Sequence, residues 1–347
     1  MDNKIPVTII TGFLGAGKTT LINELLYQPQ DEKIAVIVNE YGDVGVDHHL
    51  VVNVEEEIYQ MNNGCLCCTL RTDLSDMLQT IYSIREKQTV QIDRIIIETT
   101  GLAEPGPIAQ TFMRHPFLQE HYTIDSVITL VDAGSALYQL AHYEESKNQV
   151  AFADKLLLTK VDSVSNETLY ALKQKLRALN PFAAIDHLNL EEVAIKEVLG
   201  LELFNEQKRE KVMTEVDEEE GHDHGDDHEG HHHHHDHHHT DDIVTLSLKA
   251  KEPIHPTLID MWMNELIMTY GMDLLRYKGI LHLYKDPNQI VYQGVNMTFQ
   301  AERGQPWGDQ EKESVLVFIG KNLPVKEMEL AFKRCVLTEE VMEELGI

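Results

Sequence analysis

The strongest chemical signal in this sequence is a phosphate-binding loop. Residues 12–19 read GFLGAGKT, a full match to G-x-x-x-x-G-K-[ST], between a strand-like run and a helix-like run. Glycines let backbone N–H groups face one phosphate chain, and the helix adds the positive end of its dipole. Lys18 is predicted to reach the β- and γ-phosphates, and the Thr19 hydroxyl to ligate Mg²⁺. The predicted nucleotide contacts here are Gly12, Gly15, Ala16, Gly17, Lys18, Thr19 and Thr20.

A carboxylate that suits the same Mg²⁺ site stands at the end of another apolar run. Residues 94–101 read RIIIETTG, so Glu98 closes a β-branched segment. A phosphate loop needs such a partner at the end of a neighbouring strand. Glu98 is therefore predicted to be a catalytic Mg²⁺ ligand, and Gly101 to donate its N–H to the γ-phosphate. The alternative is a carboxylate that only caps the next turn.

A second motif indicates which base is bound. Thr159, Lys160 and Asp162 follow an apolar run as T-K-x-D, which resembles the N-K-x-D guanine-reading motif of GTPases. A carboxylate at Asp162 can accept hydrogen bonds from N1–H and the 2-amino group of guanine, and adenine offers neither donor. Lys160 is expected to lie along the base ring and the loop glycines. The alternative is an exposed Lys-x-Asp after a core strand.

Three of the four cysteines fall within four positions, as Cys65, Cys67 and Cys68. In an extended segment residues i and i+2 face the same way, so Cys65 and Cys67 can converge on one ion, and Cys68 joins them if the chain bends. Three thiolates suit Zn²⁺ and other borderline or soft metals. The fourth position is open to water, a carboxylate or a partner's ligand. Buried apolar cysteines or a redox pair are the alternatives.

Residues 39–47, NEYGDVGVD, form a polar, glycine-rich stretch after the second apolar run. Their place after the first helix is that of a switch loop. Glu40 is predicted either to add a ligand to the transition metal or to position the attacking water, so it joins Lys18 and Glu98 as a candidate catalytic group. A solvated acidic loop explains the same residues equally well.

A histidine-rich segment forms another metal-binding candidate. Imidazoles are mostly uncharged near neutral pH, so a flexible chain of them offers overlapping weak sites. It lies inside the chain, which excludes a purification tag; an incidental linker is the alternative. The predicted weak ligands are His222, His224, His228, His231, His232, His233, His234, His235, His237, His238 and His239. Three others, His115, His255 and His282, are expected to be structural.

These groups need a scaffold, and the apolar pattern predicts an α/β fold. Continuous β-branched runs separated by helical stretches indicate a doubly wound parallel sheet with both faces covered. Strands are expected at 7–10, 34–38, 95–97, 127–131 and 156–158, and helices around 70–84 and 169–179. A second set of strands is expected at 243–248, 274–283, 289–292, 295–299 and 315–319, with helices at 256–270 and 325–332. The second set predicts a smaller α+β domain with a mostly antiparallel sheet.

Composition divides the chain into three parts. Residues 1–204 are predicted to form the P-loop GTPase domain with the metal site. Residues 205–242 form an acidic, His-rich flexible linker, because its Glu, Asp, His and Gly cannot bury apolar surface. Residues 243–347 form the smaller C-terminal domain.

Charge and composition exclude several classes of partner. The 347 residues carry 58 acidic and 29 basic side chains, a net charge of −29, which argues against nucleic acid and anionic membranes. Four cysteines do not make a disulfide scaffold. No apolar stretch approaches a membrane span, and the first residues lack the apolar region of a signal peptide. The expected compartment is the cytoplasm, where thiols stay reduced; the oligomeric state is left open.

Taken together these motifs resemble the CobW-type GTPases, a metallochaperone branch of the P-loop GTPases. The resemblance covers nearly the whole chain, with the motifs in the family's order. It departs at Thr159, where the family has Asn, and at Glu104, where Asp is frequent. The matching segments are residues 12–19, 39–40, 42–47, 64–68, 98–105, 131–133, 159–162, 254–256 and 275–279.

The resemblance implies slow GTP hydrolysis coupled to delivery of a transition metal to a client protein. It implies that Cys65, Cys67 and Cys68 form the high-affinity site, with Glu40 beside it. Zn²⁺ is the expected metal, and Co²⁺ or Ni²⁺ accept the same ligands. The client is expected to dock on the C-terminal domain.

Two other functions fit parts of the sequence. A metal storage or buffering protein would use the cysteines and histidines, with the nucleotide as a structural ligand. A small-molecule kinase would use the same phosphate loop, but Asp162 and the lack of an obvious base for an acceptor argue against it.

Overall fold

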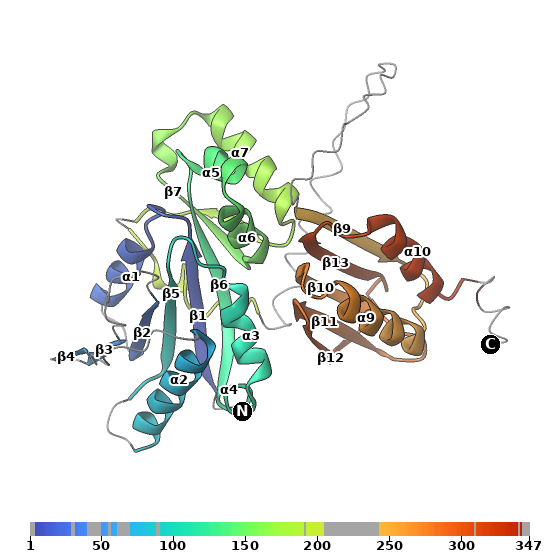
Figure 1. The fold of residues 1–347 in the computed structure, drawn as a ribbon, viewed down its shortest axis with the longest axis horizontal. Coiled ribbons are helices and arrows are strands. Elements are labelled where there is room, and N and C mark those ends of the chain that lie inside the picture. Colours follow the sequence, from blue (N-terminus) through green and yellow to red (C-terminus); the bar gives the residue numbers. More distant parts are fainter. Residues whose placement is uncertain are drawn as a thin grey trace.

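The computed structural model describes residues 4–28, 32–39, 50–54, 57–60, 70–87, 91–190, 192–204, 243–308, 310–338 and 341. Within them, two sheet-centred units follow one another along the chain (Figure 1). The α/β prediction for the first unit and the α+β prediction for the second are confirmed. No helix of the described ranges is long and apolar enough to cross a membrane.

The first unit is built on an eight-stranded sheet of order β4-β3-β2-β5-β1-β6-β7-β8. The six strands from β2 to β8 in this order run parallel, and β3 and β4 continue the sheet antiparallel. The five predicted strands of this unit are confirmed as β1, β2, β5, β6 and β7. The bounds are β1 Ile5–Gly12, β2 Ile34–Asn39, β3 Leu50–Val54, β4 Glu57–Gln60, β5 Arg94–Thr99, β6 Tyr122–Asp132, β7 Lys155–Thr159 and β8 Ala184–His187.

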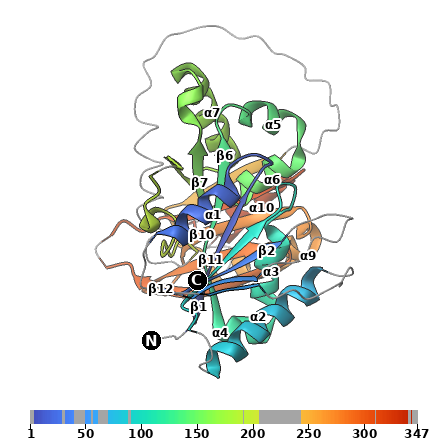
Figure 2. The ribbon, with the colours of Figure 1, turned by 90° about the vertical axis from the view of Figure 1, so that its left-hand side faces the viewer.

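Helices cover both faces of this sheet, with α1 on one side and α2 and α3 on the other (Figure 2). Successive side chains of β5 point to opposite faces of the sheet: Ile95 and Ile97 pack with α2 and α3, whereas Ile96 packs with α1. The apolar run is continuous because helices cover both faces. The helices are α1 Lys18–Tyr27, α2 Leu70–Glu86, α3 Gly106–Arg114, α4 Pro116–His121, α5 Ala136–His142, α6 Glu144–Phe152 and α7 Asn166–Leu179. Two 3-10 turns are η1 Val161–Ser163 and η2 Ile195–Glu197.

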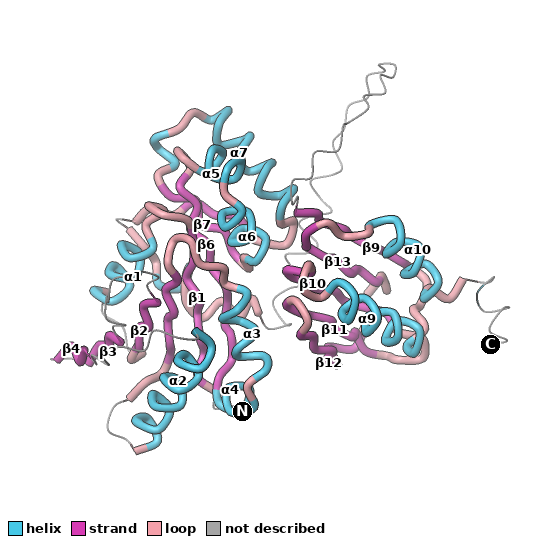
Figure 3. The backbone as a smooth tube through the Cα atoms, in the orientation of Figure 1, coloured by secondary structure: helices cyan, strands magenta, loops and turns pink. Residues whose placement is uncertain are grey.

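The second unit is an antiparallel five-stranded sheet of order β12-β11-β10-β13-β9, with two helices (Figure 3). Tyr277 and Phe318 of this sheet share a buried cluster with Trp262 and Phe332 of the helices. The elements are β9 Ile243–Ala250, α9 Pro256–Tyr270, β10 Leu274–His282, β11 Asn288–Val295, β12 Thr298–Pro306, β13 Ser314–Lys321 and α10 Val325–Cys335.

One predicted strand of this unit, residues 295–299, is wrong. β11 ends at Val295 and β12 begins at Thr298, so the predicted strand spans the turn of a hairpin. Asn296 has a φ of 48°, the left-handed conformation that asparagine tolerates better than other side chains. Apolar residues lie on both sides of this turn, so the hydrophobic pattern alone does not reveal it.

The two units meet through a buried cluster of charges. Side chains alternate along β10, so Tyr277 packs under α9 while Arg276 and Lys278 face the first unit. Both cations pair with Asp154, which precedes β7. Asp154 also accepts a hydrogen bond from the Val127 N–H at 2.9 Å. Ionic contacts therefore attach the second sheet directly to the core of the first.

Candidate nucleotide site

The loop between β1 and α1 has a backbone that only glycine fits. Gly12 has a φ of 142°, and a Cβ there would lie 2.5 Å from the Leu130 carbonyl oxygen. Gly17 caps α1 with a φ of 101° and provides no side chain to occupy the first N–H groups of the helix. The loop therefore presents backbone N–H groups at the positive end of a ten-residue helix, as anion binding requires.

Lys18 is the cation of this loop. Its side chain is buried, and Nζ donates to the carbonyl oxygens of Gly12 at 2.8 Å and Phe13 at 3.3 Å. Burial lowers the pKa of Lys18, and the nearby Glu98 carboxylate opposes that shift. A phosphate chain in the loop would add the negative charge that such a buried ammonium favours.

Thr19 and Glu98 come together as the sequence predicts. Thr19 Oγ1 donates to Glu98 Oε1 at 2.7 Å. The pairing of β1 with β5 sets this contact, because Ile10 lies opposite Glu98 in the parallel register. A hydroxyl and a carboxylate are hard oxygen ligands, so this pair fits Mg²⁺.

The other loop positions differ in their exposure and contacts. Ala16 is buried, Gly15 has a φ of 78°, and Thr20 is exposed on α1. Gly101 lies against the loop so closely that a Cβ there would be 2.8 Å from the backbone nitrogen of Leu14. The segment after β5 is therefore placed beside the phosphate site.

The T-K-x-D motif is attached to the phosphate loop by two side chains. The buried Thr159 hydroxyl donates to the Ala16 carbonyl oxygen at 3.0 Å. Lys160 has a φ of 55°, and its Nζ donates to the Gly15 carbonyl oxygen at 2.9 Å. Threonine in place of asparagine thus keeps a direct hydrogen bond to the loop. Asp162 is exposed in η1, free of the core.

Sequence reasoning missed the role of Asp132. It ends β6 and pairs with Lys160 at 2.7 Å through Oδ2, while Oδ1 accepts from the Gly134 N–H at 2.9 Å. The ion pair holds Lys160 over the loop. The sequence feature that could have indicated this role is a carboxylate at the end of a predicted parallel strand, the same feature that identifies Glu98.

The predicted transition-metal ligands lie outside the described residues. This applies to Glu40, Cys65, Cys67 and Cys68 and to the eleven histidines between His222 and His239. Among the residues that are described, no group of three or more His, Cys, Asp or Glu side chains could hold a metal ion. The fourth cysteine, Cys335, is buried, and burial raises the pKa of its thiol to about 11.

The structural role predicted for His255 is confirmed. It is the N-cap of α9, where Nδ1 accepts a hydrogen bond from the Leu258 N–H at 3.3 Å. Half-buried His282 packs edge-on against Trp307, and burial lowers the pKa of its imidazole. Both histidines serve the second unit and not the nucleotide site.

Asp162→Asn is expected to weaken GTP binding by about 100-fold and to improve binding of xanthosine triphosphate. The asparagine N–H₂ would face the 2-amino group of guanine, donor against donor, whereas xanthine has an oxygen there. Competition binding with GTP, ATP and xanthosine triphosphate measures the change. Asp76→Asn, an exposed carboxylate of α2, is the control. Unchanged GTP affinity in Asp162→Asn would show that Asp162 does not read the base.

Two families match the chain, one for each structural unit. The family described as CobW/HypB/UreG, nucleotide-binding domain, matches residues 6–186. The family described as cobalamin synthesis protein cobW C-terminal domain matches residues 243–336.

Curated relatives match over nearly their full lengths. The chain is 36% identical to the zinc chaperone YjiA of Escherichia coli (strain K12), across 95% of this chain and 98% of that protein. It is 33% identical to the zinc chaperone CobW of Pseudomonas aeruginosa, across 92% of this chain and 88% of that protein. It is 29% identical to the zinc-regulated GTPase metalloprotein activator 1 of Schizosaccharomyces pombe, across 92% of this chain and 83% of that protein.

The fold matches a solved structure as well. The crystal structure of Zn(II)-bound YjiA GTPase from E. coli superposes with a TM-score of 0.75 and 32% sequence identity. The match covers 96% of this chain and all of that one. The arrangement of both units is therefore shared with that protein.

Proposed function

The chain belongs to the CobW/HypB/UreG family of nucleotide-binding proteins, and on that premise we propose that it is a GTP-hydrolysing metallochaperone that carries zinc to a client protein. The observation that carries the nucleotide part is that three motifs meet at the carboxyl ends of the parallel strands of the first sheet. Thr19 of the loop donates to Glu98 of β5. Thr159 and Lys160, at the end of β7, donate to carbonyl oxygens of the same loop.

The chemistry follows from these groups. Water attacks the γ-phosphorus in line, the bond to the β–γ bridging oxygen breaks, and GDP leaves with that oxygen. The Lys18 ammonium and the N–H groups at the start of α1 face the developing charge. Thr19 and Glu98 would hold Mg²⁺, which when bound neutralises charge on the β- and γ-phosphates. Lys160 and Asp162 orient the base, and this places the phosphates of the same nucleotide in the phosphate loop.

Zinc is the proposed cargo. Relatives named zinc chaperones support it, and Cys65, Cys67 and Cys68 are the ligands that suit it, with Glu40 beside them. Co²⁺ and Ni²⁺ accept the same ligands and are the competing ions. Three closely spaced thiol ligands must stay reduced, which supports a cytoplasmic location. The histidine-rich part of 205–242 would collect metal in weak sites before transfer.

The client is proposed to dock on the second unit, residues 243–347. In this unit β10 faces the first unit, and α9 covers the opposite face of the sheet (Figure 1). Met261 and Met268 lie one heptad apart on α9 and are 64% and 77% exposed. Flexible thioether side chains are typical of surfaces that bind protein partners.

Zinc affinity is expected to be at least about 10-fold tighter with a non-hydrolysable GTP analogue and Mg²⁺ than with GDP. The measurement is competition with a chelator on a chain lacking residues 215–242, so that only the cysteine site reports. Linkage requires that zinc tighten binding of the analogue by the same factor. With GTP in place of the analogue, zinc should pass to an added apo-protein as hydrolysis proceeds.

Two cysteine variants sharpen this experiment. Cys67→Ser should lose the high affinity, whereas Cys335→Ser, buried in the second unit, should keep it. Equal zinc affinity with the analogue and with GDP would overturn the proposal in favour of metal storage. Phosphate transfer from GTP to a small molecule, found in a screen of acceptors, would favour the kinase alternative.

A further inference from the structure

Gln149 of α6 is a buried polar residue that no motif marks. We propose that Gln149 is a positioning residue for GTP hydrolysis, because it fixes the backbone of the loop 101–104 that follows Glu98. The inference rests on the proposed GTPase function. It adds a residue that lies outside all the nucleotide motifs.

The contacts of Gln149 are directed at that loop. The side chain is 1% exposed, and Nε2 donates to the carbonyl oxygens of Gly101 and Ala103, at 3.1 Å each. The neighbouring Asn148, also buried, donates to the Glu104 carboxylate. Two successive residues of α6 therefore hold the loop at three of its four positions.

The position of this loop matters for the phosphate site. Its first residue, Gly101, touches the phosphate loop at Leu14, and its N–H is the group expected to face the γ-phosphate. A donor stabilises developing charge only if it is held in place before the reaction. The two hydrogen bonds from Gln149 occupy the carbonyls that flank Leu102, so the loop cannot turn without breaking them.

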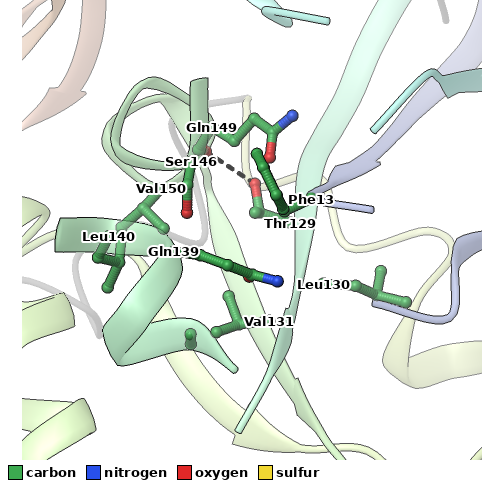
Figure 4. A pocket seen from close by; sticks show the side chains of 10 residues that line it. Phe13, Thr129, Leu130, Val131, Gln139, Leu140, Ser146, Gln149 and Val150 are labelled. Atoms are coloured by element: carbon green, nitrogen blue, oxygen red, sulfur yellow. Dashed lines mark hydrogen bonds between the residues drawn. The ribbon is translucent and has the colours of Figure 1, made fainter. Parts of the chain in front are cut away.

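α6 itself is held in place by contacts with three other elements. Asn180 Nδ2 donates to the carbonyl oxygens of Val150 at 2.8 Å and Ala153 at 2.9 Å. Arg276 of the second unit donates to the Phe152 carbonyl oxygen. Thr129 of β6 donates to the Gln149 carbonyl oxygen at 2.9 Å, beside Phe13 of the phosphate loop (Figure 4). Gln149 is thus a fixed support, and the second unit helps to fix it.

The test compares Gln149→Met with the parent chain. Methionine keeps the length of the side chain but removes both hydrogen bonds. The kcat of GTP hydrolysis is expected to fall by about 10-fold to 100-fold, because a small displacement of the loop misplaces the γ-phosphate contact. KM should change by less than about threefold, and GDP affinity should stay within about twofold, since Gln149 contacts neither the base motif nor Lys18.

Gln139→Met is the matched control. Gln139 lies on α5 in the same neighbourhood, but its amide donates to Ser135 of the preceding turn, and within the described residues no hydrogen bond joins it to the 101–104 loop. It should keep the parent kcat. A Gln149→Met chain with parental kcat, or with GDP and GTP affinities lowered equally, would overturn the proposal. Failure of the proposed function itself would appear in the parent chain, as absent hydrolysis, and is thereby distinguished.

Discussion

Replacing Lys18 by alanine is expected to lower kcat/KM for GTP by about 1000-fold. The ammonium is the buried cation of the phosphate loop, held by two loop carbonyls. No other side chain of the described P-loop, residues 12–19, carries a positive charge. Phosphate release under single-turnover conditions measures hydrolysis, and a fluorescent GDP analogue measures binding.

The free energy of unfolding, measured against pH, shows whether Lys18→Ala loses activity without losing its fold. Burial lowers the pKa of Lys18 in the folded chain below its value in the unfolded chain. Between these two pKa values the unfolded chain binds more protons than the folded chain. Folding stability therefore rises as pH rises through the lowered pKa, and Lys18→Ala should lose that rise while folding normally. Lys175→Ala, on the exposed side of α7, is the control for charge alone. Hydrolysis within about tenfold of the parent in Lys18→Ala would exclude the assigned role.

The second large effect is expected for Asp154→Ala, which should lower the free energy of unfolding by about 3–5 kcal/mol. Asp154 is buried and pairs with Arg276, which is 3% exposed, and with Lys278. Removing the carboxylate leaves a guanidinium buried without its partner charge. Burial already lowers the pKa of Arg276, and Asp154 is the group that opposes this shift. Equilibrium unfolding in denaturant measures the loss.

Asp186→Ala is the matched control for this prediction. Asp186 also pairs with a lysine, Lys155, at 2.7 Å, but its own side chain is 55% exposed. Lys155 is only 10% exposed, but its Nζ also donates to the Glu197 carbonyl oxygen at 3.1 Å, so it keeps a partner in the variant. The expected loss is therefore less than about 1 kcal/mol. Equal losses in the two variants would contradict the view that the charge cluster attaches the second unit to the first.

Much of the site could be predicted because its motifs are local. The phosphate loop requires glycines at particular backbone angles, and these stand next to Lys18 and Thr19 in the chain. Glu98 was found because a carboxylate ends an apolar strand, and the structure places it 2.7 Å from the Thr19 hydroxyl. The cysteine and histidine assignments stay predictions, since those residues lie outside the described ranges.

The missed residues share one property, that their partners are remote in sequence. Asp132 lies 28 positions from Lys160, and Gln149 lies 48 positions from Gly101. No spacing rule connects such pairs, because strand register and helix packing decide which side chains meet. The hairpin turn at Asn296 was missed for a different reason, since apolar residues flank it on both sides.

The α/β class, most strands and helices, and the nucleotide motifs could be predicted from the amino-acid order, because each depends on local backbone preference or on the period of apolar residues. The packing of the folded chain was needed to show that Thr159 reaches the phosphate loop and that α6 supports the 101–104 loop. The same packing brings Arg276 and Lys278 together on Asp154. These contacts join segments that are separate along the chain, and they form only when the buried faces of both sheets are packed together.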